Sequence, residues 1–394
     1  MTRRVVWVWR TVAAVVVAVA FVACLPTLCV QAPVQVIDEE TESSGSTSLE
    51  LEVDALRETY RFPAVVGCII RADEIVETVV TGVRKVGEDD PVVAADLFHI
   101  GSMTKAMTST MLATLVQEGR LQWDMTLTQG FPTFAGELNW RFRNVTLEHL
   151  LSHTAGLAGF TTDEEWATIP AFEGTPAQQR QAFAFWLLTR APAVRVGVYR
   201  YSNAGYAIAA AIAEGVTGST WEQLMQERLL GPLNIRARYG WPLLSGWQEP
   251  WGHWIKEDGV LAHDPADGYK VPTVLVPAGD VSVTIGDYAV FAQLHLAGLE
   301  GRGSAILTAA AIQRLHQPIL KYSLGWHEEL IDGIPTSSHH GSVDTFSTFV
   351  LLQPTRDVGV ILFANADGND WSVASAWQAA RDLADAYGLP RRPD

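Results

Sequence analysis

Three short motifs in this chain hold the residue types that acyl-transfer chemistry needs. The first is Ser102-Met103-Thr104-Lys105, at the start of an apolar helical pattern over Met103 to Glu118. Residues three apart on a helix share one face, with Cβ atoms roughly 5–6 Å apart. A serine hydroxyl is a weak nucleophile that needs a base within hydrogen-bonding reach, so Lys105 is a candidate to take its proton or to polarise it. Taken alone, the pattern also describes an N-cap serine followed by a surface lysine.

The second motif is Tyr201-Ser202-Asn203, which directly precedes a helical pattern over Ala204 to Glu214. A phenol beside a lysine is expected to lose its proton more readily than its reference pKa of about 10 suggests. Tyr201 is therefore a candidate base toward a serine and a candidate acid toward a leaving group. The amide of Asn203 can hold the lysine and a substrate carbonyl. Alone, the motif also describes a tyrosine packed on the start of a helix with an asparagine cap.

The third motif is His339-His340-Gly341-Ser342, just before an apolar strand pattern over Phe346 to Gln353. A glycine in this position lets another backbone, here that of a substrate, approach closely. The backbone N–H of Ser342 is a candidate oxyanion donor that would act together with the N–H of Ser102. The alternative interpretation is a polar strand start with two exposed histidines.

Apolar patterns at both ends of the chain indicate the elements that must position these motifs. They predict a helix over Leu49 to Tyr60, a hairpin of strands Ala64 to Ile70 and Ile75 to Thr81, a second hairpin of strands Phe346 to Gln353 and Val358 to Asn365, and a closing helix over Trp371 to Tyr387. The expected fold class is α+β, with one antiparallel sheet flanked by helices. Residues 49–120 and 275–390 would build this α/β part, and residues 121–274 would form a mostly helical insertion.

Together and in this order, the motifs resemble those of the serine β-lactamase-like family of class C β-lactamases, D-alanyl-D-alanine carboxypeptidases and their esterase and D-aminopeptidase relatives. The matching runs are Phe98–Lys105, similar to F-x-I-G-S-x-x-K; Leu150–Leu157, similar to L-L-T-H-T-S-G-L; Tyr199–Tyr206, similar to F-x-Y-S-N-x-G-Y; and Ala278–Thr284, similar to A-G-G-L-x-S-T. The resemblance covers about residues 50 to 388 and implies a β-lactamase/transpeptidase-like fold.

The resemblance also implies a catalytic set. Ser102 would be the acylated nucleophile, and Lys105 and Tyr201 would share the acid and base work, with the identity of the base left open. The positions that contact substrate or form the oxyanion hole would be Asn203, His339, Gly341 and Ser342.

One departure from the family pattern bears on the substrate. The position of the family's K-T-G lysine is His339 here, and histidine, with a reference pKa of about 6.5, is mostly neutral at pH 7. We therefore expect weak binding of substrate carboxylates, a histidine limb in the pH profile, and hydrolysis of esters or amides, D-amino-acid peptides included. The alternatives are a β-lactamase or D-Ala-D-Ala carboxypeptidase, and a non-catalytic acylated sensor or assembly protein.

The N-terminal residues predict export. A positively charged segment with Arg3, Arg4 and Arg10 precedes an apolar run over Val12 to Ala23, as in a signal peptide. Cys24 ends a lipobox-like run and would become the lipidated first residue, and an uncleaved anchor is a third possibility. Residues 1–30 are thus interpreted as a signal and residues 31–48 as a tether. The expected location is periplasmic or extracellular, with or without a membrane anchor.

Composition limits the partners and cofactors. The formal net charge of −16 indicates a surface that repels nucleic acid, so we expect a small-molecule or peptide substrate and no nucleic-acid partner. Cys68 lies inside an apolar run and is interpreted as a buried hydrophobic residue rather than a reactive thiol. His149 and His153 have a spacing that zinc can use, but no third ligand is evident. No metal and no organic cofactor are expected.

Overall fold

The computed structural model of the chain describes residues 48–245, 248–268, 270–368 and 373–388. The chain divides into two units, residues 1–45 and residues 46–394, and all described residues belong to the second. The interpreted signal, the tether up to residue 47 and Cys24 lie outside the described residues. Within the described part of the chain, every helix is too short or too polar to cross a membrane.

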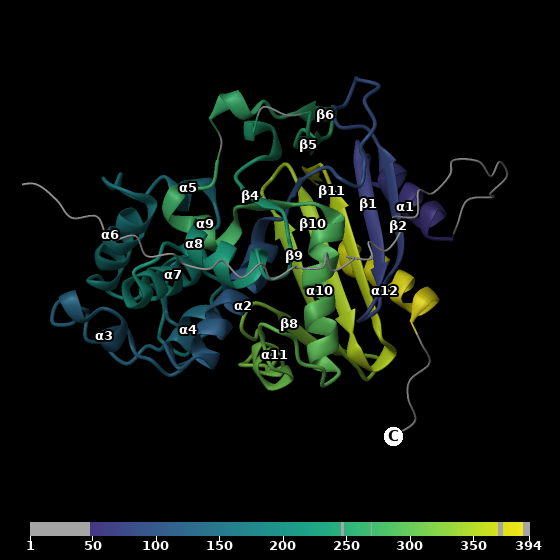
Figure 1. Cartoon of the computed structure of the whole chain (residues 1–394). Coiled ribbons are helices and arrows are strands. Elements are labelled where there is room, and N and C mark those ends of the chain that lie inside the picture. The colour runs from purple at the N-terminus through teal and green to yellow at the C-terminus, as the bar shows by residue number, and fades with distance from the viewer. Residues whose placement is uncertain (1–47, 246–247, 269, 369–372, 389–394) are drawn as a thin grey trace, which may run out of the picture. The chain divides into compact units, whose positions relative to one another are not determined.

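The centre of the second unit is a six-stranded antiparallel sheet in the order β2-β1-β11-β10-β9-β8. Its strands are β1 Ala64–Ile70, β2 Ile75–Gly82, β8 His327–Ile331, β9 Ile334–Ser342, β10 Ser347–Gln353 and β11 Val358–Ala364. The two hairpins predicted from the ends of the sequence are confirmed, and they join where β1 pairs with β11. Figure 1 shows the purple N-terminal strands beside the yellow C-terminal ones.

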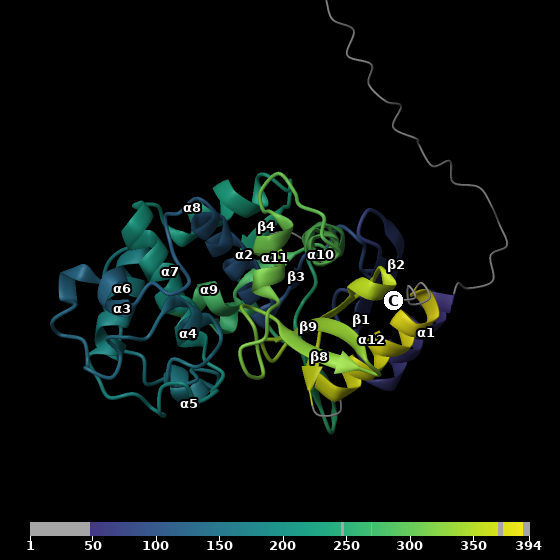
Figure 2. The same ribbon diagram turned by 90° about the horizontal axis from the view of Figure 1, so that it is seen from below.

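Helices cover both faces of this sheet. Helix α10, Ile285–Leu299, packs against one face, and α1, Ser48–Thr59, and α12, Val373–Tyr387, pack against the other. Figure 2 shows α10 and α12 on opposite sides of the strands. Because both faces are covered, β1 and β11 are buried along their whole lengths and carry continuous apolar runs rather than an alternating pattern.

The side chains of β1 alternate between two hydrophobic cores. Val66 and Cys68 belong to the core under α10, whereas Val65 and Ile69 belong to the core under α1 and α12. Cys68 is fully buried and forms no disulfide, and burial raises the pKa of its thiol to about 11. The interpretation of Cys68 as a buried hydrophobic residue is confirmed, because such a thiol stays protonated and inaccessible.

The middle of the chain is mainly helical. Its helices are α3 Leu127–Gly130, α4 Leu147–Leu151, α5 Asp163–Trp166, α6 Pro176–Leu188, α7 Asn203–Thr217 and α8 Trp221–Met225. Helix α2, Thr104–Gln117, precedes this part, and α9, Val276–Gly279, and α11, Ala309–Leu315, follow it. Helices α3, α4, α6 and α8 each begin with a capping box. In each, the N-cap threonine and the side chain three residues later accept each other's backbone N–H. Strands β4 Ala237–Tyr239, β5 His253–Lys256 and β6 Gly259–Ala262 also fall within 121–274, so helices dominate only up to about residue 235.

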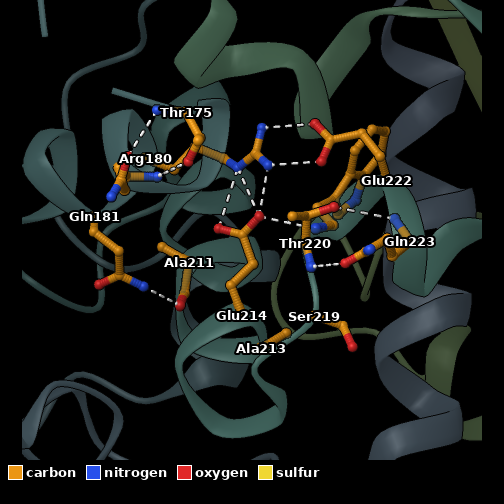
Figure 3. A network of polar contacts seen from close by, with 12 residues as sticks. Thr175, Arg180, Gln181, Ala211, Ala213, Glu214, Ser219, Thr220, Glu222 and Gln223 are labelled. Carbon is orange, nitrogen blue, oxygen red and sulfur yellow. Dashed lines mark hydrogen bonds and ion pairs between the residues drawn. The ribbon is translucent and has the colours of Figure 1, made fainter. Parts of the chain in front are cut away.

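A buried ion network joins three helices of this middle part (Figure 3). Arg180 on α6 is fully buried and bonds Glu214 on α7, with Nε to Oε1 at 3.1 Å, and Glu222 on α8, with Nη1 and Nη2 each 3.0 Å from an oxygen. Glu214 also accepts the backbone N–H of Trp221 at 2.8 Å. The network therefore fixes the packing of α6, α7 and α8, and α7 follows directly on the Tyr201-Ser202-Asn203 motif.

We expect Arg180→Met to lower the free energy of unfolding by about 3–5 kcal/mol, because it leaves the Glu214 carboxylate buried without its cation. The matched control is Arg302→Met, which removes a pair with Glu300 made by a guanidinium that is 46% exposed. That change should cost about 1 kcal/mol or less. Urea unfolding followed by tryptophan fluorescence gives both values. Equal effects of the two changes would show that the buried network does not hold these helices.

Candidate active site

Ser102 lies in a single 3₁₀ turn, Gly101–Met103, that leads directly into α2. Gly101 has a left-handed backbone, with a φ of +48°. A Cβ at this glycine would lie 2.6 Å from the backbone nitrogen of Ser342 on β9. Only a glycine allows so close an approach with this backbone, so the turn brings the backbone around Ser102 directly against the end of β9.

Gly341 meets the same turn from the other side. A Cβ there would lie 2.0 Å from the carbonyl oxygen of Ile100. We expected this glycine to make room for the backbone of a substrate. The structure corrects that expectation, because the protein's own backbone occupies the space above Gly341.

A histidine and a carboxylate hold the turn in place. The Nδ1 atom of His99 accepts the backbone N–H of Gly101 at 3.1 Å, so its Nε2 carries the proton and donates to Asp280 at 2.9 Å. His99 belongs to the short strand β3, Phe98–His99, which pairs with β7, Val281–Val283. The Ala278–Thr284 run of the sequence therefore supports the turn that contains Ser102.

Lys105 is the second residue of α2, and its side chain is fully buried. Its Nζ lies 2.9 Å from Ser102 Oγ and 2.7 Å from the carbonyl oxygen of Ala278, and it lies 4.8 Å from the ring centre of Tyr201. Burial holds the pKa of this amine well below its usual value, because the ammonium form loses its hydration. The protonation equilibrium of Lys105 is thus shifted toward the neutral amine, which lies beside the serine hydroxyl.

The Tyr201-Ser202-Asn203 segment, at the start of α7, also lies beside Ser102 and Lys105. Its anchor is His153, whose Nδ1 accepts the backbone N–H of Ser202 at 3.1 Å and whose ring centre lies 4.3 Å from that of Tyr201. Asn203 Nδ2 donates to the carbonyl oxygen of Phe160 at 2.7 Å, and its Oδ1 is buried without a partner among the described residues. We expected Asn203 to hold Lys105, but the Asn203 side chain donates to Phe160, and Lys105 instead donates to the Ala278 carbonyl oxygen.

The pKa of Tyr201 moves in the direction opposite to the sequence expectation. Burial raises it well above its usual value, and a hydrogen bond with Ser102 offsets the rise only in part. The physical reason is that the neighbouring Lys105 is itself buried with a lowered pKa, so it is not a fixed cation that would stabilise a phenolate. Tyr201 is therefore held as a neutral phenol beside the serine.

His339 faces the interior rather than open solvent. Its Nδ1 donates to the carbonyl oxygen of His340 at 2.7 Å, and its Nε2 accepts the hydroxyl of Tyr322 at 2.8 Å, so both ring nitrogens have partners within the protein. Burial, with smaller effects of His327 and Lys105, holds the pKa of His339 well below its ordinary value. The histidine limb expected near pH 6.5 is thereby moved to lower pH, and no cation stands at this position at neutral pH.

Ser342 ends β9 beside the turn that contains Ser102. Its hydroxyl donates to the carboxylate of Asp367, on the two-residue strand β12, Asp367–Gly368. This bond engages the Ser342 side chain away from Ser102 and leaves the backbone N–H as the group close to Gly101. The pKa of Asp367 is raised to about 6, mainly by burial.

Two cavities meet at this constellation. The first, of about 380 Å³, is bounded by Ser102, Tyr201, Asn203 and Ser342 together with residues 161–164 and 343–344. The second, of about 410 Å³, shares Ser102, Tyr201 and Ser342 and extends along β8 and β9 past His327 and Ser338. All seven residues proposed from the three motifs thus lie in or directly beside one candidate site, although the surroundings of Gly341 and His339 differ from those expected.

Four residues that contact the site were not among the site residues expected from the motifs. His153, Tyr322, Asp280 and Ala278 act through contacts with residues far away in the chain. His153 lies in the run resembling L-L-T-H-T-S-G-L, and Ala278 and Asp280 lie in the run resembling A-G-G-L-x-S-T, so the resemblance is the signal that could have pointed to these three. Its partner in the zinc-like spacing, His149, instead bonds the hydroxyl of Thr146 at the start of α4, with 2.6 Å between Nδ1 and Oγ1.

The chain belongs to the β-lactamase family: the family model described as Beta-lactamase matches residues 49–385. The family comprises serine hydrolases with the β-lactamase/transpeptidase-like α+β fold, which act on small-molecule or peptide substrates. The fold class expected from the sequence is therefore confirmed.

Individual relatives are distant. The chain is 27% identical over 336 residues to penicillin-binding protein 4 of Amycolatopsis lactamdurans, covering 79% of this chain and 83% of that protein. It is 28% identical over 287 residues to an unguisins hydrolase of Aspergillus campestris, covering 68% of this chain but only 52% of that longer protein. An octameric penicillin-binding protein homologue from Pyrococcus abyssi superimposes with a TM-score of 0.70 at 21% identity, covering 86% of this chain and 76% of that one, which shows likeness of fold alone.

Proposed function

We propose that this protein is a serine hydrolase that cleaves esters or amides through a covalent acyl-enzyme on Ser102. The observation that carries the proposal is the 2.9 Å contact between Lys105 Nζ and Ser102 Oγ, made where burial lowers the pKa of the lysine. A neutral amine at hydrogen-bonding distance is what a serine hydroxyl needs to act as a nucleophile. Membership of the β-lactamase family supports the same chemistry.

In the proposed acylation, Ser102 Oγ gives its proton to the lone pair of Lys105 Nζ and bonds to the carbonyl carbon of the substrate. The backbone N–H groups of Ser102 and Ser342 would stabilise the oxyanion that forms. Tyr201, kept protonated by its raised pKa, would donate its proton to the leaving alcohol or amine and recover one from Lys105. Water then attacks the acyl-enzyme by the reverse sequence, which releases the acid and restores Ser102.

The surroundings of His339 favour esters and amides over substrates with a carboxylate beside the reacting bond. A lysine at this position would be a fixed cation, whereas His339 is buried, has a lowered pKa and bonds Tyr322 and the His340 carbonyl with its two nitrogens. It therefore offers a bound carboxylate neither charge nor a spare N–H. For this reason we propose esters and amides as the substrates, and β-lactams and D-Ala-D-Ala peptides as the alternative substrates.

We expect the full-length protein to hydrolyse p-nitrophenyl butyrate with a kcat/KM at least a hundredfold above that for a chromogenic cephalosporin. The reason is that only the cephalosporin needs a partner for its carboxylate. Initial rates for both compounds at neutral pH give the ratio. Comparable or faster turnover of the cephalosporin would mean that His339 does not exclude β-lactams, and the β-lactamase alternative would take its place.

The remaining alternatives correspond to other outcomes of the same experiment. A stable mass increase on Ser102 without turnover would favour the acylated sensor. Large ordered oligomers in sedimentation, with neither turnover nor a mass increase, would favour the assembly protein. On the strength of the signal-like residues 1–30, we propose that the activity operates outside the cytoplasm.

A further inference from the structure

A chain of hydrogen-bonded side chains connects helix α2 to the edge of the six-stranded sheet. Oγ1 of Thr110 on α2 lies 3.0 Å from Nε2 of His295 on α10, and Nδ1 of His295 lies 2.8 Å from Nε2 of His316, directly after α11. Nδ1 of His316 lies 3.0 Å from Oε1 of Glu328 on β8 and 2.8 Å from Oγ of Ser337 on β9. The chain therefore joins segments that are far apart in the sequence.

This chain is shielded from solvent. Its side chains on α2, α10 and β9 are buried, as is His316, and the side chain of Glu328 is 13% exposed. The ring of Trp326 packs against both histidine rings, with centres 4.9 Å and 4.8 Å away. In such surroundings a polar atom without a hydrogen-bonding partner costs free energy, so the protons along the chain can be counted.

The direction of the hydrogen bonds is set at the α2 end. The Thr110 hydroxyl donates to the carbonyl oxygen of Ala106 at 2.7 Å, and a carbonyl oxygen can only accept. Because Thr110 has no second proton, Nε2 of His295 donates to it and Nδ1 of His295 accepts. His316 then donates from Nε2 to His295, which leaves Nδ1 of a neutral His316 without a proton.

The other end of the chain needs one proton more than Ser337 can supply. The contacts there are those of His316 Nδ1 with Glu328 and Ser337, and that of Ser337 Oγ with Glu328 Oε2 at 2.8 Å. The Ser337 hydroxyl has a single proton. With an ionised Glu328 and a neutral His316, at least one carboxylate oxygen would therefore face a lone pair. The missing proton belongs on Glu328 or on His316.

Burial favours Glu328 as the holder of this proton. It keeps the pKa of the Glu328 carboxyl well above its usual value, and the hydrogen bond with Ser337 offsets the rise only in part. Burial also lowers the pKa of His316 to about 3. Both shifts have the same cause, since a poorly hydrated site disfavours the carboxylate and the imidazolium alike. The two groups therefore form a neutral pair of a carboxylic acid and an imidazole.

The titratable and charged groups around this pair leave the proton in place. On β8 itself, His327 and Glu329 lie on the opposite face and bound the second cavity. From α11, Arg314 pairs with a carboxylate of α4 rather than with Glu328. The histidine of α10 lies behind His316, and burial lowers its pKa well below the usual value.

The chain connects the two elements that carry the proposed reaction groups. It begins at the carbonyl of Ala106, the residue after Lys105 on α2. It ends at Ser337, which is paired with Glu328 in the register of β8 and β9 and lies on the same strand as Ser342. The strand that supplies a proposed oxyanion donor is thus tied to the helix that supplies the proposed base.

We propose that Glu328 is a positioning residue that acts as a protonated acid: it donates its proton to His316, completes the chain from β9 to α2, and so fixes the position of Ser342 beside the turn that contains Ser102. The inference rests on the proposed function, which supplies the reaction, and adds a residue outside both cavities. Loss of the proton would place a carboxylate oxygen opposite the lone pair of His316. The chain should therefore weaken as the pH rises through the raised pKa of Glu328.

Glu328→Gln tests the protonation state, because a glutamine amide has the shape of a protonated carboxyl and offers an N–H to His316 and an oxygen to Ser337. The unfolded wild type releases this proton near about pH 4.3, whereas the folded chain keeps it to higher pH. The wild type should therefore lose stability relative to Glu328→Gln as the pH rises from about 4.3 to the raised pKa. Urea midpoints of both proteins across this range give the difference.

Two further variants complete this comparison. Glu328→Met has a similar length but no polar head group, so it leaves His316 and Ser337 without their partner and should unfold at a lower urea concentration than Glu328→Gln at every pH. The matched control is Asp332→Asn, which changes a carboxylate that is 66% exposed at the turn of the same hairpin. It should not show the gain with pH. A Glu328→Gln protein no more stable than Glu328→Met would indicate a carboxylate–imidazolium pair and overturn the proposal.

Activity tests the positioning role. With p-nitrophenyl butyrate near neutral pH, Glu328→Met should lower kcat by about tenfold and leave KM within about twofold, because a displaced oxyanion donor weakens the transition state more than the bound substrate. Glu328→Gln should keep kcat within about twofold of the wild type and should keep it at alkaline pH, where the wild type loses activity. An unchanged kcat in Glu328→Met would leave the hydrolase intact and overturn only the inference.

If p-nitrophenyl butyrate is not cleaved, the proposed hydrolase fails, and hydrogen exchange then decides the role of Glu328. The backbone amides of β8 and β9 should exchange faster in Glu328→Met than in the wild type, and Glu328→Gln should restore the wild-type rates at neutral pH. Equal exchange in all three proteins would show that Glu328 does not fix this edge of the sheet, and would overturn the inference.

Discussion

Ser102→Ala is expected to lower the hydrolysis of p-nitrophenyl butyrate by a factor on the order of 10⁴ or more. The hydroxyl of Ser102 is the proposed nucleophile, and its Oγ lies 2.9 Å from Lys105 Nζ, the proposed base. In a serine protease whose catalytic residues act as a unit, removing the nucleophile alone costs nearly as much as removing the whole set. Initial rates with purified protein give the ratio directly.

The control for this change is Ser304→Ala, in an exposed loop between α10 and α11. It should keep wild-type activity and should still take up one equivalent of a fluorophosphonate label, detected as an increase in intact mass. Ser102→Ala should take up none, while its thermal unfolding midpoint stays close to that of the wild type. Full activity or full labelling of Ser102→Ala would remove the acyl-enzyme mechanism.

Lys105→Met is expected to lower kcat by about 10²–10⁴-fold, the usual contribution of a positioned general base. Methionine has a similar length and suits a fully buried position, so the change removes the amine without opening a large cavity. The variant should remain folded, because it also removes the cost of burying an amine. Lys85→Met, a change on the surface where Lys85 pairs with Glu88 at 2.8 Å, is the matched control and should keep full activity.

The pH dependence of the two proteins adds an independent measurement. Activity should require the neutral amine of Lys105, so wild-type kcat/KM should fall as the pH drops below the lowered pKa of this lysine. The residual kcat/KM of Lys105→Met should not show this fall at low pH.

The free energy of unfolding should also depend on the protonation of Lys105. The unfolded chain binds a proton on Lys105 up to about pH 10.4, whereas the folded chain releases it at lower pH. The wild-type free energy of unfolding should therefore rise with pH between the lowered folded pKa and about pH 10.4, and the variant should lack this contribution.

Tyr201→Phe decides between the two candidate bases. If Lys105→Met keeps activity within tenfold of the wild type while Tyr201→Phe abolishes it, the tyrosine is the base and our use of the lysine is wrong. The raised pKa of Tyr201 and the lowered pKa of Lys105 lead us to expect the opposite order for the proton abstraction step.

Much of the fold was predictable from local patterns. The hairpins over β1–β2 and β10–β11 carry apolar runs separated by short turns, and helix α2 carries an apolar pattern that ends near Gly119. These features depend on neighbours within a few residues, which a sequence displays directly. The short strands β4 to β6 were not predicted, because their three or four residues are fixed by pairing partners elsewhere, such as Val283 for Ala237.

The sequence by itself determined which residues are chemically available: a serine and a lysine one helical turn apart, a tyrosine and an asparagine ahead of a second helix, and a glycine before a late strand. Their types and short spacings required no knowledge of the rest of the chain. Only the tertiary structure decided their state. The pKa directions of Lys105 and Tyr201, the bonding of His339 to Tyr322 and the bond between Ser342 and Asp367 all depend on burial and on contacts between distant segments, and these arise only when the chain is folded.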